Sequence, residues 1–133
     1  MTTSLSGINL WAVVVAGIVH TVIGLVWFMP KLFGNSWVEL TGKEMKPAGH
    51  WIPAGLIGHQ VMAFVLAVIM NLANVTSLGG GIVVGILVCL GFMATLEIGE
   101  LIWEKIPLKL FMIRVGNQLV GLASAGAILA IWR

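Results

Sequence analysis

Four long apolar stretches dominate this sequence of 133 residues, and they constrain its fold more than any other feature. They cover residues 8–29, 52–72, 81–103 and 108–132. A helix of about 20 apolar residues crosses the hydrocarbon core of a bilayer, which is about 30 Å thick. Charged residues make up only 9% of the chain, against about 25% in soluble domains. We therefore predict an all-α integral membrane protein: a single transmembrane domain over residues 1–133, a bundle of four transmembrane helices with lipid as its main surroundings.

Tryptophan and proline mark the edges of these stretches. The indole side chain favours the interface between lipid and water, because it combines an apolar ring with one N–H donor. Proline is tolerated best near helix ends, where its missing N–H costs least. Both residue types fall near the ends of the four stretches: Trp11, Trp27, Trp51, Trp103 and Trp132, with Pro30, Pro53 and Pro107.

The lysines predict the orientation of the chain. Loops rich in Lys and Arg stay in the cytoplasm. The loop 73–80 carries no charge, whereas the loop 30–51 and the link between the last two stretches are basic, with Lys31, Lys43, Lys46, Lys105 and Lys109. We expect both basic segments in the cytoplasm and both termini outside it.

The segment after the first stretch has an apolar face of its own. Leu32, Phe33, Trp37 and Leu40 recur at helical spacing, while Lys31 lies elsewhere on the helix. A short helix in the plane of the membrane interface has this pattern. We expect such an interfacial segment directly after the first transmembrane helix.

The residues from Gly24 to Trp37 also resemble a known signature. They read GLVWFMPKLFGNSW, which is similar to the domain of unknown function 1761, a family of bacterial membrane proteins; Phe28 and Met29 stand where that family more often has Tyr and Ser. The last helix also looks like that of the family. The resemblance implies four helices and a bacterial inner (plasma) membrane, and it implies no activity. The positions that carry it are Gly24, Trp27, Pro30, Phe33, Gly34 and Trp37.

This motif is consistent with a role in architecture. Gly24 lets a neighbouring helix approach. Trp27 anchors the helix end at the interface, and Pro30 stops the helix. Gly34 permits a turn into the interfacial segment.

Small residues at spacings of four predict close helix packing. Gly81 and Gly85 form such a stripe on the third stretch, and Gly121 belongs to one on the fourth. In lipid, helices associate through close contacts of this kind. These faces can pack within one chain or between copies of the chain.

Polar residues inside the spans form the only candidate site. A charge at a helix centre costs about 2.5–3.5 kcal/mol by insertion scales. At about 1.5 Å per residue, these residues fall on one level in the cytoplasmic half: His20, His59, Glu97, Glu100, Arg114 and Asn117.

Three interpretations of this level are open. In the first, Arg114 pairs with Glu97 or Glu100, and the other polar groups complete a buried network that fixes helix register. In the second, the same groups line a pocket for a proton, a cation or a small polar substrate. In the third, His20, His59 and a carboxylate from three separate helices bind a metal.

The sequence favours few classes of function. It contains no Asp, one cysteine and no paired metal-ligand motif, so we expect no enzyme activity, cofactor or resident metal. The net charge of +2 without a basic cluster predicts no nucleic-acid partner. We expect a small non-enzymatic membrane protein that acts by assembly, as a homo-oligomer or an accessory subunit of a membrane complex. The alternative is a small transporter or channel with a cytoplasm-facing polar site between the helices.

Overall fold

The computed structural model describes residues 5–132, apart from the side chain of Ala48. These residues form helices and no strands, and four helical segments are long and apolar enough to cross a membrane. The all-α, four-helix prediction is thus confirmed. The elements in chain order are α1 (Leu10–Trp27), η1 (Pro30–Gly34), α2 (Asn35–Thr41), α3 (Ala48–Leu72), α4 (Leu78–Val88), η2 (Cys89–Ala94), α5 (Thr95–Trp103) and α6 (Leu108–Ile131).

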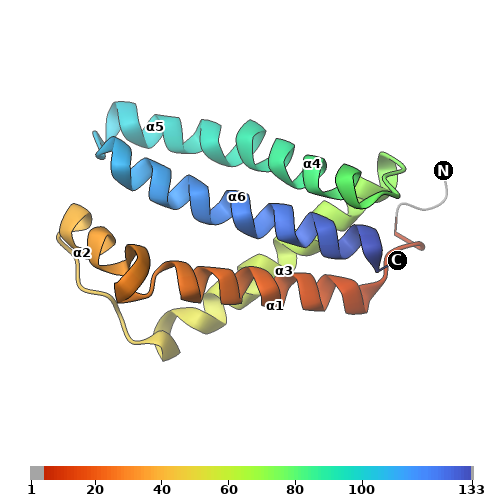
Figure 1. Cartoon of the computed structure of the whole chain (residues 1–133), viewed down its shortest axis with the longest axis horizontal. Helices are drawn as coiled ribbons and strands as arrows, with labels where there is room; N and C mark the ends of the chain where they lie inside the picture. Colours follow the sequence, from red (N-terminus) through yellow and green to blue (C-terminus); the bar gives the residue numbers. More distant parts are fainter. Residues whose placement is uncertain (1–4, 133) are drawn as a thin grey trace.

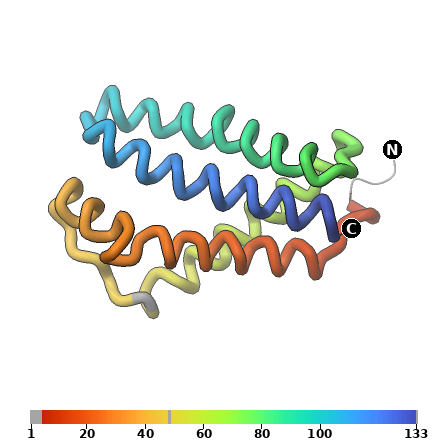
Figure 2. Tube along the Cα trace, in the orientation of Figure 1, coloured from red at the N-terminus to blue at the C-terminus, as the bar shows by residue number. Residues whose placement is uncertain are grey.

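The helix α6 lies in the middle of the bundle. It packs against α4 on one side and against α1 on the other (Figure 1). The helix α3 packs mainly against α1 and crosses it at an angle, so only its later turns approach the start of α4 (Figure 1). The chain begins α1 and ends α6 at the same end of the bundle, as the tube in Figure 2 shows.

The helix boundaries differ most from the expected spans at the starts of α3 and of the third span, and α1 is two residues shorter than expected at each end. The helix α3 begins at Ala48 rather than at residue 52, so Pro53 lies inside its first two turns instead of at its edge. The third span begins at Leu78, three residues earlier than expected, because the side chain of Ser77 caps it by accepting a hydrogen bond of 3.0 Å from the backbone N–H of Gly80.

A π-helical turn interrupts the third span. The segment η2 lies between α4 and α5, and the three together run from Leu78 to Trp103. Gly81, Gly85 and Cys89 are buried at spacings of four, and the next buried residue, Ala94, follows after five. A π turn inserts one extra residue into a helix. The insertion therefore keeps one face of this long helix directed at α6.

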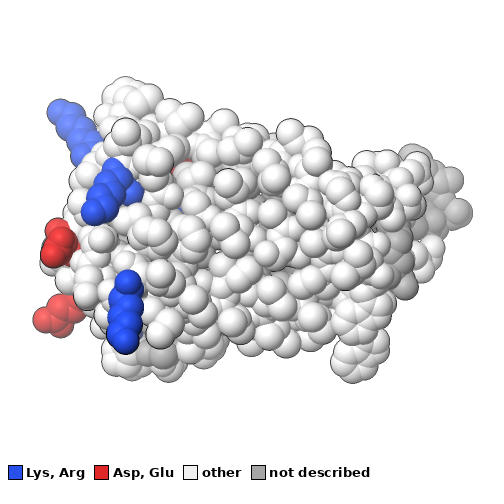
Figure 3. All heavy atoms as spheres, in the orientation of Figure 1, with Lys and Arg blue, Asp and Glu red and all other residues white. Residues whose placement is uncertain are grey.

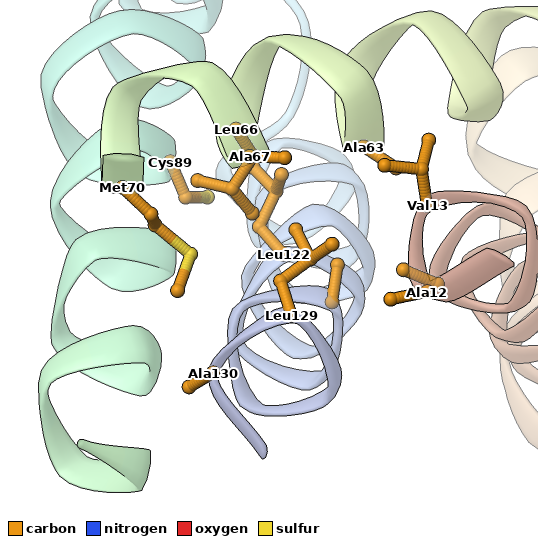
Figure 4. Close-up of a cluster of buried hydrophobic side chains, with 12 residues drawn as sticks. Ala12, Val13, Ala63, Leu66, Ala67, Met70, Cys89, Leu122, Leu129 and Ala130 are labelled. Atoms are coloured by element: carbon orange, nitrogen blue, oxygen red, sulfur yellow. The ribbon is translucent and has the colours of Figure 1, made fainter. Parts of the chain in front are cut away.

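The apolar core fills the half of the bundle away from η1 and α2. Side chains from α1, α3, η2 and α6 converge there, as Figure 4 shows. The fully buried Leu66 and Leu122 are the largest aliphatic members. The cluster consists of Ala12, Val13, Ala16, Ala63, Leu66, Ala67, Met70, Cys89, Leu122, Ala125, Leu129 and Ala130.

The glycine stripe of α4 contacts α6 within the chain. A Cβ atom at Gly81 would meet the carbonyl oxygen of Gly126, and one at Gly85 would meet the carbonyl of Leu122. The two helices approach so closely that their backbones touch, which only glycine permits at these points.

The charged side chains gather at the other end of the bundle. Figure 3 shows basic side chains in blue and acidic side chains in red there, and a mostly uncharged surface along the rest of this face. We call this end, which is formed by α2, the loop 42–47 and the link between α5 and α6, the charged end. Trp103 lies at this end with 82% of its surface exposed, and Trp11 lies at the opposite end with 73% exposed. Both positions suit the two interfaces of a bilayer.

Candidate binding site at the charged end

The signature segment folds back onto the end of α1. Met29 is extended, and η1 and α2 then continue as one short helical arm, Pro30–Thr41. Gly34 has an ordinary helical φ of −62°, so the turn at this position does not use the conformational freedom of glycine. The physical reason is close approach: a Cβ at Gly34 would collide with the carbonyl oxygen of Phe28 and with Met29.

Trp27 ties α1 to α6. Its indole N–H donates a 3.0 Å hydrogen bond to the carbonyl of Ile113, and its ring lies over Gly116 and beside Phe33, with ring centroids 4.7 Å apart. We expected this indole to meet headgroups. Because its only donor is used by α6, it acts instead as a clamp between two helices.

Two histidines from different helices stack in the bundle. The rings of His20 and His59 lie 4.0 Å apart between centroids and 17° from parallel. His20 is almost completely buried, and its Nε2 lies 3.0 Å from Oε1 of Gln118 on α6. Gly121 makes room for it, because a Cβ there would overlap the imidazole. These contacts join α1, α3 and α6 on one polar level.

Among the described residues, Arg114 has one acidic partner. Its guanidinium lies 3.4 Å from a carboxylate oxygen of Glu97, and both side chains are about one-third exposed, 34% and 30% respectively. Glu100 makes no ion pair with it among the described residues. Within residues 5–132 no three His, Cys, Asp or Glu side chains gather as a metal site, and the two histidines face each other instead.

Asn117 is the buried exception on this level. Only 6% of it is exposed, and its Oδ1 is fully buried with no hydrogen-bond partner among the described residues. The rest of its amide has no such partner in residues 5–132 either. A Cβ at Gly24 would lie 3.9 Å from that oxygen, so Gly24 leaves space beside it. Buried polar groups without partners are rare in native proteins and mark places that need an explanation.

A large cavity leads from the charged end to Asn117. Its volume is about 540 Å³, within the usual range of small-molecule sites. The loop residues 43–46 lie at its mouth. The large cavity is lined further by Thr21 and Gly24 of α1, Phe28 directly after α1, Trp37 of α2, Trp51, Gly55 and His59 of α3, and Asn117 of α6.

A small cavity lies on the other side of Asn117. It measures about 270 Å³ and is lined by the ion pair of Glu97 and Arg114, among others. Phe28 and Asn117 line both cavities. The unpartnered amide therefore lies in the wall between them.

Comparison with known proteins agrees with the signature. The profile of a protein family described as protein of unknown function (DUF1761) matches residues 11–130. The chain belongs to the DUF1761 family. No curated protein and no solved structure matches the chain.

In this DUF1761 protein, several residues of the large cavity carry a weak sequence signal or none. Thr21 directly follows His20, and Trp37 belongs to the signature, but neither was expected to face a cavity. From the sequence, Trp51 is expected at the membrane interface and the loop 43–46 as part of a basic loop. They line the cavity because the first turns of α3 diverge from α6, which no local pattern reveals.

Proposed function

We propose that this chain is a membrane protein that binds a small molecule in the large cavity. The observation that carries the proposal is a cavity of about 540 Å³ that ends at the buried, unpartnered amide of Asn117. An apolar pocket with a few convergent polar groups is the usual form of a ligand site. An unpartnered amide in its wall supplies the polar group that a ligand would satisfy. The proposal assigns no chemical reaction to the cavity.

The position of the core supports binding from one side. The cavity begins at the charged end, and the packed apolar cluster fills the opposite half of the bundle. A path through a single chain would have to open this cluster, so a binding site fits a single chain better than a channel does. With the orientation expected from the lysines, the mouth faces the cytoplasm of a bacterium and both termini lie outside it.

A cysteine-labelling experiment tests whether the cavity is accessible to water. In a Cys89→Ala background, Gly55→Cys places a thiol in the cavity wall, where nothing lies within 4 Å of the new Cβ. Ile57→Cys is the matched control, because Ile57 is exposed two residues further on, on the opposite side of α3. Thiolates form in water and not in lipid.

The expected result is specific to one side of the membrane. A membrane-impermeant maleimide added at the charged end should label Gly55→Cys and leave Ile57→Cys unlabelled until the bilayer is dissolved. If Gly55→Cys resists labelling as Ile57→Cys does, the cavity is dry and the proposed function fails.

Assembly is a second candidate, and the position of α3 favours it. Only 17% of the most apolar stretch of α3 is buried within the chain, against 39% for α1 and α6. A second copy or another subunit would cover this face, whereas the α4 glycines are already used by α6. Cysteines at Ile57 and Val61, both exposed on α3, should then form disulfides between chains in native membranes. If neither position cross-links, α3 is not an interface.

A further inference from the structure

The hydrogen bonds of Thr21 determine which nitrogen of His59 carries a proton. The Thr21 hydroxyl oxygen lies 2.9 Å from the carbonyl oxygen of Gly17 and 2.9 Å from Nδ1 of His59. A hydroxyl has one hydrogen, and a carbonyl can only accept. Both contacts are satisfied when Thr21 donates to Gly17 and accepts from Nδ1–H of His59.

This assignment leaves an acceptor on the wall of the cavity. In a neutral imidazole that is protonated at Nδ1, the lone pair is on Nε2. His59 lines the large cavity, and among the described residues its Nε2 has no hydrogen-bond partner. His59 on α3 therefore offers an acceptor, and the amide of Asn117 on α6 offers an acceptor and donors to the same space.

The remaining lining restricts the charge of a ligand. The charged residues that line the cavity are Lys43, Glu44 and Lys46, all in the loop at its mouth. An ionic head group at the inner end would lie without a counter-ion, which is costly in an apolar environment. Phe28, Trp37 and Trp51 provide flat apolar surfaces along the way, which suit an apolar or aromatic body.

We propose that the large cavity binds neutral amphipathic molecules head first, with a hydroxyl or N–H of the head donating to Nε2 of His59 and the oxygen of the same head paired with the Asn117 amide. This inference rests on the proposed function and names its ligand class: phenols, alcohols and carboxamides with an apolar body. Charged organic ions and molecules without a donor bind poorly.

Matched pairs of probes test this class. The probes are 2-naphthol, 4-phenylphenol and naphthalene-2-carboxamide, each beside its O-methyl or N,N-dimethyl analogue, which keeps the body and loses the donor. Binding is measured by equilibrium dialysis against the full chain in nanodiscs, with empty nanodiscs to subtract partition into lipid. We expect saturable binding of at least one donor and binding of its methylated partner at least tenfold weaker.

Two variants locate the effect. His59→Phe keeps a ring against His20 and removes the acceptor, so it should abolish the preference for the donor. Asn117→Leu should weaken every donor without restoring the methylated analogues. If a variant fails to fold, the comparison of each donor with its methylated analogue in the wild-type protein still tests the ligand class.

The outcomes separate this inference from the proposed function. Equal saturable binding of both members of each pair overturns the ligand class and leaves the binding site in place. A preference that persists in His59→Phe overturns the assignment to His59. No saturable binding by any probe overturns the inference, and the labelling of Gly55→Cys then decides independently whether a water-accessible cavity exists.

Discussion

Replacing Asn117 by Leu should make the protein more stable. The Asn117 side chain is buried, and its amide makes no hydrogen bond to any described residue. Leaving a buried polar group unpaired costs about 1–3 kcal/mol, and replacing it by an apolar group of similar shape removes that cost. Leu is similar in size, and two cavities adjoin the position, so we expect little steric strain.

The expected gain is measurable. A change of about 1–2 kcal/mol alters the ratio of folded to unfolded protein by a factor of about 5–30. Reversible unfolding in mixed micelles, with SDS as the denaturant and helicity or intrinsic fluorescence as the signal, should show the transition of Asn117→Leu at a higher SDS fraction than that of the wild type.

The neighbouring amide provides the control. Gln118 follows Asn117 on α6, and its Oε1 lies 3.0 Å from Nε2 of the buried His20. Gln118→Leu leaves that imidazole N–H without a partner, so it should lower stability by about 1–3 kcal/mol. Two adjacent amides on one helix should thus respond with opposite sign. If Asn117→Leu is destabilised as much as Gln118→Leu, the Asn117 amide is not an unpaired group and our reasoning is refuted.

Three further predictions concern packing, charge and orientation. Gly85→Leu should lower stability by about 1–3 kcal/mol or more, because the new side chain would collide with the backbone at Leu122. Gly91→Leu is the control: nothing lies within 4 Å of a Cβ there, so stability should change by less than about 0.5 kcal/mol. Equal effects of the two variants on unfolding would show that the glycine stripe of α4 does not contact α6. Arg114→Leu should destabilise the bundle by leaving Glu97 without its partner, and adding Glu97→Leu should recover most of the loss in the same unfolding assay; no recovery would mean that the pair is not coupled. A reporter fused to the C-terminus should be active only outside the cytoplasm, and activity inside would reverse the orientation.

The spans and the polar level could be predicted from the sequence because both depend on local properties. The length of an apolar run predicts the length of its helix, and counting residues along that helix gives the depth of His20 or Arg114 in the membrane. The same local reasoning predicted the close approach at Gly81 and Gly85, because a stripe of small residues has this meaning in any helix pair.

The partners of these groups could not be predicted in the same way. The glycine stripe gives no indication that α6, rather than α1 or a second chain, contacts it. Trp27 looks like an interfacial anchor until the carbonyl of Ile113 is found 3.0 Å from its N–H. The choice between Glu97 and Glu100 for Arg114 depends on the rotation of α5, which the π turn in η2 shifts. Each of these contacts depends on how the helices are oriented in space, which no periodic pattern in the sequence predicts.

Apart from the partly exposed Glu100, the residues of the polar level divide into two kinds, and this division distinguishes structure from function. His20 with Gln118, His59 with Thr21, and Arg114 with Glu97 each have a partner on another helix, so the fold itself explains why these polar groups are present. Asn117 has none among the described residues, and a Leu side chain at the same position would cost less free energy. The Asn117 amide thus destabilises the fold and lines two cavities, one of which opens at the charged end. A binding site requires such a group, because a ligand can supply the hydrogen-bond partner that the fold does not.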